Sequence, residues 1–347
     1  MGDARVLVSV VVPTRNRAHL LPEAVASVQA QELEDWELIV VDDASDDGTS
    51  DWVAGVADPR VRGIRLDQHG ERSAARNTGL EAARGRYVLF LDDDDRLLPR
   101  TLLELSSALD RFDHAVAAVG AVEGFDDRGH RRRFRHPRRR HVRDVFDDVM
   151  FGWVGLPAAT LFRRAAVNDA GGWSAALTQG EDQELALRLA LLGPTVLVPG
   201  TVVEQRLHTD QRRPKDTFEI ENATREAFLA GAPAAVRDRG TRTLVARRRV
   251  REGVVDWVER RPRAALRHFT AALQSQPSLI TSPLVGRRLR SLWLRCVVGA
   301  VVGGRALLVA YRAVWWVRRK AKRAPYSTAS AVPDATGVPL AEHNETD

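Results

Sequence analysis

The chain has 347 residues, of which 44% are hydrophobic and 28% are charged, a composition typical of a globular protein with ample core. Its single cysteine, Cys296, excludes an intrachain disulfide and fits a reducing cytoplasm. The formal net charge is +6, and its uneven placement along the chain is more informative than the total. The apolar run Val6–Val12 is too short for a secretory signal, so we expect a cytoplasmic protein.

The first hundred residues alternate predicted strands with predicted helices. Continuous β-branched or apolar runs predict buried strands at Val6–Val12, Trp36–Val41, Val61–Leu66 and Tyr87–Leu91. Helical spacing of apolar residues predicts helices at Leu20–Gln31 and Ser73–Ala83, another capped by Thr49 or Ser50, and a helix-like segment opening at Leu97–Pro99. This alternation predicts an α/β fold built on a mostly parallel sheet flanked by helices.

Four consecutive carboxylates, Asp92–Asp95, follow the strand Tyr87–Leu91. Like charges within one turn repel each other, so the cluster is costly unless a cation lies beside it. Mg²⁺ and Mn²⁺ prefer carboxylate oxygens and usually also hold substrate phosphates. A second acidic cluster, within Asp42–Asp47, ends the strand Trp36–Val41 at the same edge, where open α/β sheets bind ligands. The alternative for either cluster is a solvated acidic turn.

Four motifs in this half together resemble the family 2 glycosyltransferases of GT-A fold. They are Val10–Asn16 (VVVPTRN), Val40–Thr49 (VVDDASDDGT), Ala74–Gly79 (AARNTG) and Leu91–Asp95 (LDDDD). The resemblance implies a nucleoside diphosphate sugar as donor and Mn²⁺ or Mg²⁺ as cofactor. The residues that it assigns to the donor are Pro13, Thr14, Asn16, Asp42, Asp43, Arg76, Asp92 and Asp93.

Within that resemblance, Pro13, Thr14 and either Asp42 or Asp43 would hold the base and ribose. Arg76 would meet the diphosphate, where a guanidinium can contact two oxygens at once. Asp92–Asp94 would be the family's DXD motif, in which Asp92 faces the ribose or the metal and Asp94 binds the metal. Without the resemblance, Arg76 is equally well read as a solvated helix charge.

A candidate general base lies at the start of a predicted helix. Leu185 and Leu189 share a helical face, so Glu181 and Asp182 fall in the first turn, where the helix dipole stabilises carboxylate anions. The resemblance assigns Asp182 as the base that takes the proton of the acceptor hydroxyl; the alternative is helix capping. Trp173 is either an acceptor-stacking platform or a core residue, and Glu181 is a weaker candidate for contact with acceptor or phosphate.

Further strands are predicted at Ala115–Glu123, Ala158–Arg164, Val196–Val198 and Val202–Val203. After them, Arg206–Leu207–His208 resembles the Arg-Xaa-His element of many bacterial members of the family. By that resemblance His208 is a further metal ligand and Arg206 neutralises the leaving diphosphate. Gln205 stands where the family usually has tyrosine, and a lone histidine can equally be structural.

An arginine-rich stretch covers residues 130–143. Its arginines are Arg131, Arg132, Arg133, Arg135, Arg138, Arg139, Arg140 and Arg143. Such a run is usually a solvated loop; the alternatives are contact with an anionic acceptor or with phospholipid. We expect no nucleic-acid partner, because no aromatic residues are interleaved and no binding motif is present.

Beyond about Thr217 the pattern becomes helical. Small and aromatic residues at the spacing of one tetratricopeptide repeat are Gly253, Ala265, Phe269, Ala272 and Pro277. One repeat is not stable without neighbours, so we expect a helical appendage to the first domain and no peptide-binding array.

Residues 282–324 hold eleven basic residues and no acidic one. The apolar segment Leu292–Val317 is long enough to span a bilayer, but it contains Arg295, Arg305 and Arg312. Inserting each arginine near the bilayer centre would cost about 2.5–3.5 kcal/mol, which argues against spanning. Aromatic residues suited to an interface are Trp293, Tyr311, Trp315 and Trp316. We therefore expect an amphipathic helix on an anionic membrane surface, with core packing and spanning as alternatives.

The expected domains are a GT-A domain at 1–216, a helical appendage at 217–281, a basic membrane-associated segment at 282–324 and a disordered polar tail at 325–347. The expected function is metal-dependent, inverting sugar transfer to an acceptor hydroxyl, which a lipid could carry, in cell-surface glycan or glycolipid synthesis at the inner face of the cell membrane. Inversion follows from the resemblance and from one candidate base with no evident nucleophile.

Two alternatives stay open. A nucleotidyltransferase acting on a sugar phosphate also uses carboxylate-bound metal, but normally has a Gly-Thr-Arg loop where Pro13–Asn16 stands. A non-catalytic sugar-nucleotide-binding or membrane scaffold protein is disfavoured by the carboxylates at Asp92–Asp94 and Asp182.

Overall fold

The computed structural model of the chain describes residues 6–126, 129–133, 140–153, 155, 157–208, 217–282 and 285–302. The chain divides into two compact units. The first unit takes residues 1–146 and 154–214, and the second takes residues 147–153 and everything from residue 215 onward.

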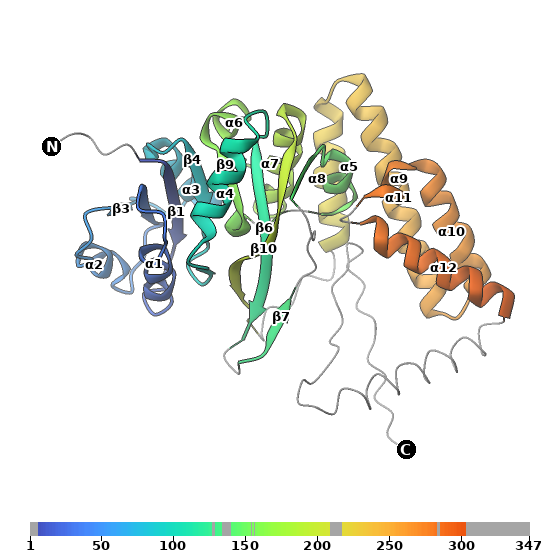
Figure 1. The fold of residues 1–347 in the computed structure, drawn as a ribbon, viewed down its shortest axis with the longest axis horizontal. Helices are drawn as coiled ribbons and strands as arrows, with labels where there is room; N and C mark the ends of the chain where they lie inside the picture. The colour runs from blue at the N-terminus through green and yellow to red at the C-terminus, as the bar shows by residue number, and fades with distance from the viewer. Residues whose placement is uncertain are drawn as a thin grey trace, which may run out of the picture. The chain divides into compact units, whose positions relative to one another are not determined.

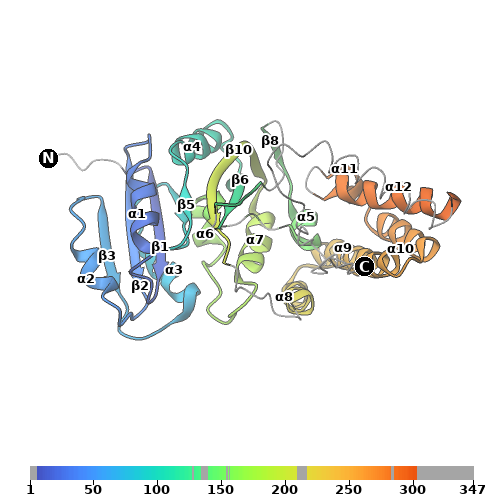
Figure 2. The same ribbon diagram turned by 90° about the horizontal axis from the view of Figure 1, so that it is seen from below.

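The first unit is built on one sheet (Figures 1 and 2). Its strands are β1 (Val8–Thr14), β2 (Trp36–Asp42), β3 (Val61–Arg65), β4 (Tyr87–Phe90), β5 (Arg96–Leu97), β6 (Ala117–Phe125), β7 (Arg131–Arg133), β8 (His141–Arg143), β9 (Thr160–Arg163) and β10 (Thr195–Arg206). The order is β3-β2-β1-β4-β9-β6-β10-β5, with β7 beside β6 and β8 beside β10.

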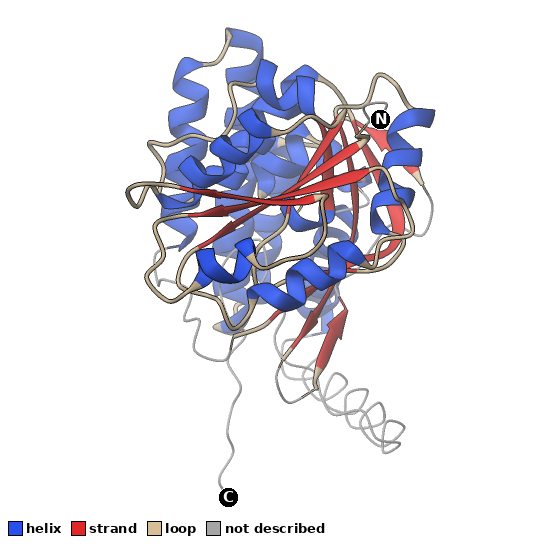
Figure 3. Cartoon of the chain, turned by 90° about the vertical axis from the view of Figure 1, so that its left-hand side faces the viewer, coloured by secondary structure: helices blue, strands red, loops and turns tan. Residues whose placement is uncertain are grey.

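Helices cover both faces of this sheet, as the red strands and blue helices of Figure 3 show. The helices of the first unit are α1 (Leu21–Gln29), α2 (Thr49–Ala54), α3 (Glu71–Ala82), α4 (Thr101–Arg111), α6 (Arg164–Asp169) and α7 (Glu181–Leu192), with a 3₁₀ turn, η1, at Pro157–Ala159. Because side chains alternate along a strand, Val10 and Val12 of β1 join one core with α1 and α4. Val11 joins a second core on the other face, with α3, α6 and α7.

The expected α/β fold of GT-A type is confirmed. The predicted parallel pairing holds from β3 through β2 and β1 to β4, whereas β9 runs antiparallel to both β4 and β6, so the whole sheet is mixed. The two predicted strands near residues 196 and 203 are one strand, β10, with irregular pairing between them.

Two local predictions were wrong. The helix expected to open at Leu97–Pro99 begins at Thr101, because Arg96 and Leu97 pair with β10 as strand β5. The helix after the second acidic cluster begins at Thr49, and its N-cap is Gly48 in the left-handed conformation, not Thr49 or Ser50.

The second unit is helical. Its helices are α5 (Phe146–Phe151, from Asp147 on), α8 (Thr217–Gly231), α9 (Ala234–Val258), α10 (Pro262–Ser275), α11 (Ser278–Thr281) and α12 (Gly286–Val302). Figure 1 shows α10 between α9 and α12, and one apolar core joins the three. Phe269 lies against Gly253, where a Cβ would come within 3.0 Å of the ring. This helix pair agrees with the predicted spacing, and the resemblance to a tetratricopeptide repeat stays a prediction.

Segment 147–153 is held inside the helical unit by buried arginines. Arg225 and Arg247, 0% and 1% exposed, donate to the carbonyl oxygens of Val149 and Phe151. The last carbonyls of a helix lack intrahelical partners; in α5, Arg247 donates to that of Phe151, and Arg225 joins the Gly152 N–H on that of Val149. Asp147 accepts two hydrogen bonds from Arg239, both at 3.0 Å. This anchoring explains why a segment lying between two sheet strands in the sequence belongs to the helical unit.

The start of the basic C-terminal segment packs as core. In α12, Cys296 is fully buried, and the half-buried Trp293 packs against the same core and donates from its indole to Thr270 Oγ1 at 3.0 Å. None of the helices in the described part of the chain is long and apolar enough to cross a membrane. Arg305, Arg312, Tyr311, Trp315 and Trp316 lie outside the described residues, as do the expected tail and residues 134–139 of the arginine-rich stretch.

Gly79 allows α3 to approach β1 closely. A Cβ at this position would lie 2.2 Å from Val11 Cγ1, and Val11 is fully buried in the sheet. Arg76 lies one turn earlier on the same helix, so this close approach also determines how far Arg76 reaches over the edge of the sheet.

We predict that Gly79→Ala lowers the free energy of unfolding by about 1–3 kcal/mol, because overpacking outweighs the better helix propensity of alanine. Urea unfolding measures it. The control is Gly55→Ala, whose added Cβ would make ordinary contacts at 3.4 and 3.6 Å and should change stability by less than about 0.5 kcal/mol. Equal stability of the two variants would contradict the prediction.

Candidate active site

The four aspartates lie at the carboxyl ends of β1 and β4. After β4 ends at Phe90, the chain turns at Asp92–Asp95, where Asp95 N donates to the Asp92 carbonyl at 3.1 Å, and returns as β5. Parallel strands β1 and β4 end side by side, so the loop after β1 faces this turn. The structure therefore brings the first and fourth motifs of the sequence together.

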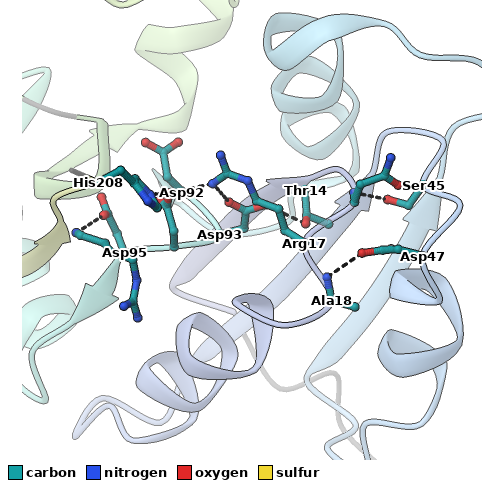
Figure 4. A network of polar contacts seen from close by, with 12 residues as sticks. Thr14, Arg17, Ala18, Ser45, Asp47, Asp92, Asp93, Asp95 and His208 are labelled. Atoms are coloured by element: carbon teal, nitrogen blue, oxygen red, sulfur yellow. Dashed lines mark hydrogen bonds and ion pairs between the residues drawn. The ribbon is translucent and has the colours of Figure 1, made fainter. Parts of the chain in front are cut away.

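Two side chains, one at the end of β1 and one in the loop after it, bind the middle of the cluster (Figure 4). Thr14 Oγ1 donates to Asp93 Oδ2 at 2.8 Å. Arg17 Nη1 lies 2.9 Å from Asp93 Oδ1 and 2.6 Å from Asp94 Oδ2, so one nitrogen bridges two carboxylates. The cation that the acidic cluster requires is thus supplied in part by the protein itself.

The end of β10 reaches the same cluster from the other side. His208 Nε2 lies 2.7 Å from Asp94 Oδ2, and the backbone N–H of Arg206 donates to Asp95 Oδ1 at 3.0 Å. The Arg206 guanidinium lies over the Phe125 ring and forms an ion pair with Glu23 at 2.8 Å. The structure therefore places the backbone of Arg206 at the cluster and pairs its guanidinium with Glu23.

Burial shifts the protonation of two of the aspartates. Burial raises the pKa of Asp93 to about 6, and repulsion from Asp94 and Asp92 adds to this, while Arg17 and Thr14 oppose it. Burial also raises the pKa of Asp95 well above its usual value, with repulsion from Asp92 and Asp94 as the next cause. Added positive charge at this turn would therefore stabilise the ionised cluster.

Arg76 connects the cluster with the start of α7. Its Nη2 lies 2.9 Å from Asp92 Oδ1 and its Nη1 lies 3.2 Å from Glu181 Oε1. The guanidinium also lies over the Trp173 ring, 4.4 Å from the centroid, and only 4% of the side chain is exposed. Arg76 is thus a buried link between two carboxylates and not a solvated helix charge.

Trp173 is a core residue. It is 3% exposed and lies edge-on to Phe90 with ring centroids 5.0 Å apart. Asn77 holds its backbone by two hydrogen bonds of 2.8 Å, one to the carbonyl and one from the N–H. The ring therefore has no exposed face for an acceptor, and of the two interpretations from sequence the structure favours core packing.

Asp182 is the second residue of α7. The helix begins after Gly180, whose φ of +81° suits glycine, and Leu185 and Leu189 are buried as their spacing predicts. Asp182 is half-buried, and its Oδ1 accepts from the Gln183 N–H at 2.7 Å. Its neighbour Glu181 is held by Arg76, so Asp182 lies one residue from the group that links α7 to the acidic cluster.

The second acidic cluster is engaged in hydrogen bonds with the protein. Asp42 accepts from the Ser45 N–H, from the Ser50 hydroxyl and from Arg65. Burial raises its pKa, but the hydrogen bonds from Ser45 and Ser50 and the charge of Arg65 lower it more, so the pKa of Asp42 falls below its usual value. Ser45 Oγ in turn accepts from the Asn16 N–H at 2.9 Å.

Asp43 organises the start of α3. Its carboxylate accepts from the Gly70 N–H at 2.7 Å and lies 2.6 Å from His69 Nδ1. Its backbone N–H donates to the Thr14 carbonyl at 2.9 Å. Pro13 is buried in β1, where it is paired in register with Val41. The ends of β1 and β2 thus bring Asn16, Asp42 and Asp43 to the same edge of the sheet as the Asp92–Asp95 turn.

In the described part of the chain, no three His, Cys, Asp or Glu side chains are arranged as a metal site. Mg²⁺ or Mn²⁺ shared with a diphosphate needs only one or two protein ligands, since phosphate oxygens supply others. Asp94 Oδ2 and His208 Nε2 lie 2.7 Å apart, and a carboxylate oxygen and an imidazole nitrogen are both ligand atoms that Mn²⁺ binds. These two side chains therefore fit a metal ion whose remaining ligands are phosphate oxygens.

Arg17 was missed from sequence. Its signal was available: Arg17 is a basic residue three positions after Thr14, just beyond a predicted strand of the same sheet that carries the four aspartates at a strand end. His69 and Asn77 were also not assigned, and no sequence pattern links them to Asp43 or Trp173 without the tertiary structure.

The sequence model of the family described as "Glycosyl transferase family 2" matches residues 9–171. This span runs from β1 through α6 and includes Thr14, Arg17, Arg76 and Asp92–Asp94. Asp182 and His208 lie beyond it.

Among curated relatives, the uncharacterized protein MT1568 of Mycobacterium tuberculosis is 33% identical over 222 residues, which cover 60% of this chain and 69% of that protein. The succinoglycan biosynthesis protein ExoO of Rhizobium meliloti is 42% identical over 119 residues, or 34% of this chain and 33% of its own length. The chain thus matches only a third of ExoO.

A crystal structure of residues 1–349 of S. aureus TarS in complex with UDP-GlcNAc resembles this chain with a TM-score of 0.58 at 20% identity. The match covers 88% of this chain and 92% of that one. At this level of identity the likeness shows the fold.

Proposed function

We propose that this chain, which belongs to glycosyl transferase family 2, transfers a sugar from a nucleoside diphosphate sugar to an acceptor hydroxyl with inversion, in cell-surface polysaccharide synthesis. The observation that carries the proposal is the convergence of Asp92–Asp94 with Arg17, Arg76 and His208 beside the first turn of α7. The relative ExoO is a succinoglycan biosynthesis protein, which supports a role in polysaccharide synthesis. The structural neighbour TarS binds UDP-GlcNAc, which supports a sugar nucleotide as the donor.

The donor would lie over the carboxyl ends of β1, β2 and β4, where ligands of open α/β sheets bind. Pro13, Thr14, Asn16 and Asp42 or Asp43 would form the side that holds base and ribose. Arg76 and Asp92 would meet the diphosphate end. Arg76 is already oriented by Glu181 and Trp173, so little side-chain entropy would be lost when it binds phosphate oxygens.

Asp94 and His208 would hold Mn²⁺ or Mg²⁺, with Asp92 beside them. The metal, when bound, would supply positive charge that stabilises the leaving diphosphate. Burial raises the pKa of Asp93, so positive charge from a bound metal would stabilise the ionised form of this carboxylate.

Asp182 would accept the proton of the acceptor hydroxyl while that oxygen bonds to the anomeric carbon and the bond to the diphosphate breaks. Attack from the face opposite the leaving group inverts the configuration. Glu181 is the less available of the two for proton transfer, because its carboxylate is engaged in an ion pair with Arg76. The dipole of α7 favours the carboxylate form of Asp182.

The family assignment favours sugar transfer over nucleotidyl transfer. Hydrolysis of the sugar nucleotide in the absence of an acceptor, measured with and without Mn²⁺, separates two classes of protein. A catalytic protein should release free sugar, whereas a non-catalytic binding or scaffold protein should not.

We also propose peripheral association with an anionic membrane surface through residues 303–324. This segment carries seven basic residues and no acidic one: Arg305, Arg312, Arg318, Arg319, Lys320, Lys322 and Arg323. Because α12 contributes Leu289 and Cys296 to the core of the helical unit, the interfacial segment proposed here is limited to the residues after α12. A lipid-carried acceptor would make such anchoring useful.

We predict that Asp94→Asn weakens UDP binding in the presence of Mn²⁺ by at least about tenfold, which is about 1.4 kcal/mol. Asparagine keeps the shape of the side chain but removes the charge that holds the metal. Isothermal titration calorimetry with and without Mn²⁺ measures it, and Asp113→Ala, 91% exposed at its side chain, is the control. Wild-type affinity in Asp94→Asn would remove Asp94 from the metal site.

For the base, Asp182→Asn should lower turnover by about 10² or more while donor binding stays within about twofold, because asparagine cannot accept the proton. Steady-state kinetics and UDP binding are measured on the same preparation. Glu181→Gln is the comparison: it should change donor affinity through Arg76 more than turnover. Near-normal turnover in Asp182→Asn would move the base elsewhere.

For the membrane, the full chain should bind anionic phosphatidylserine vesicles, and a chain ending at Val302 should not. Each Lys or Arg contributes about 1 kcal/mol near such a surface, and added salt should release the protein in part. Vesicle sedimentation measures both. Equal binding of the two chains would exclude residues 303–324 as the anchor and direct attention to residues 130–143.

A further inference from the structure

Arg17 holds an oxygen that the proposed metal needs. Its Nη1 lies 2.6 Å from Asp94 Oδ2, and His208 Nε2 lies 2.7 Å from the same oxygen. Mg²⁺ binds oxygen at about 2.0–2.1 Å, so a metal on Asp94 Oδ2 would place two cations within a few ångströms of each other. Their repulsion at a poorly hydrated site is strong, so Arg17 and the metal compete for Asp94.

The competition can be resolved by the Arg17 side chain alone. The backbone on either side is fixed: Asn16 N–H donates to Ser45 Oγ, Ala18 N–H donates to Asp47 Oδ2 at 3.0 Å, and the Arg17 carbonyl accepts from Leu20 N–H at 2.9 Å. The side chain is 34% exposed, against 8% and 12% for the two carboxylates it contacts. A rotamer change therefore releases Arg17 without moving the loop.

Arg76, the other guanidinium that contacts the aspartates, is less free to move. The Arg76 side chain is 4% exposed and is held by Asp92, Glu181 and the Trp173 ring. Figure 4 shows Arg17 extending from the loop after β1 across to Asp93, on the side of the cluster opposite His208. A guanidinium that leaves Asp94 from this position stays tethered at the end of β1, beside the expected diphosphate.

We propose that Arg17 is an exchangeable counter-cation that neutralises Asp93 and Asp94 until a divalent metal takes Asp94, and then binds the diphosphate of the donor. The inference rests on the proposed function and assigns a further donor-binding residue to that site. The planar guanidinium suits both positions, because it can contact two oxygens of carboxylates or of phosphates.

The experiment titrates Mn²⁺ alone, and then UDP at saturating Mn²⁺, into the full chain by calorimetry. In Arg17→Gln, Mn²⁺ alone should bind about tenfold tighter than in wild type, because the competing charge is gone. UDP with Mn²⁺ should bind about tenfold more weakly, because a phosphate contact is lost. Arg15→Gln, which alters an exposed arginine two residues away, is the matched control and should behave as wild type in both titrations.

Arg17→Lys keeps the proposal testable if the glutamine variant is unstable. Lysine retains the positive charge, so the affinity for Mn²⁺ should stay near that of wild type. The affinity for UDP should fall, because an ammonium group cannot contact two phosphate oxygens at once as a planar guanidinium does. Thermal melting without metal should rank wild type above Arg17→Lys and Arg17→Lys above Arg17→Gln, with Mn²⁺ narrowing the differences.

Unchanged or weaker Mn²⁺ binding in Arg17→Gln overturns the competition, and unchanged UDP binding in both variants overturns the phosphate contact. If wild type binds UDP with Mn²⁺ and loses this in Asp94→Asn, such results reject Arg17 alone and leave the proposed function standing. If neither wild type nor Arg17→Gln binds Mn²⁺, with or without UDP, the metal assignment fails and this inference fails with it.

Discussion

Repulsion among the four carboxylates of Asp92–Asp95 is the constraint on which the site depends. Burial raises the pKa of Asp93 and of Asp95, and repulsion from the neighbouring aspartates adds to it, so the ionised forms of these two carboxyls are high in energy. The protein offsets this with guanidiniums from separate parts of the chain, Arg17 after β1 and Arg76 on α3, and His208 after β10 contacts the same cluster. The acidic turn thus draws together elements that are distant in the sequence.

Arg76 extends this network to the start of α7. Because its guanidinium contacts both Asp92 and Glu181, any change in charge at Asp92 alters the electrostatics of the helix turn that carries Asp182. Glu181 therefore relates the donor side of the site to the candidate base, although it is itself the weaker candidate for proton transfer. The close packing of α3 on β1 at Gly79 holds this link in place.

The helical unit has its own polar framework. Buried Arg225 and Arg247 donate to the buried carbonyl oxygens of Val149 and Phe151 at the end of α5, and Asp147 is paired with Arg239. Burial raises the pKa of Asp147, but hydrogen bonds from Arg239 and Ser278 and the charge of Arg239 lower it more, so the net pKa is below its usual value. Segment 147–153 thereby belongs to this unit, although the strands on either side of it belong to the sheet.

The sequence by itself determined the α/β class, the succession of β1 to β4 along the chain and the position of the acidic clusters at strand ends. These follow from local patterns: β-branched runs, helical spacing, and carboxylates that a strand end can expose. It also determined that Asp182 lies in the first turn of a helix, because the spacing of Leu185 and Leu189 is a property of that helix alone.

Only the tertiary structure decided how charges are paired. Arg17 and Asp94 are 77 residues apart, and Arg76 and Glu181 are 105 apart, so no local pattern could join them. The burial of Trp173, the pairing of the Arg206 guanidinium with Glu23 and the use of Arg96–Leu97 as a strand depend likewise on partners elsewhere in the fold. Local sequence specifies where a charge can stand, whereas its partner is set by which strand ends the sheet places side by side.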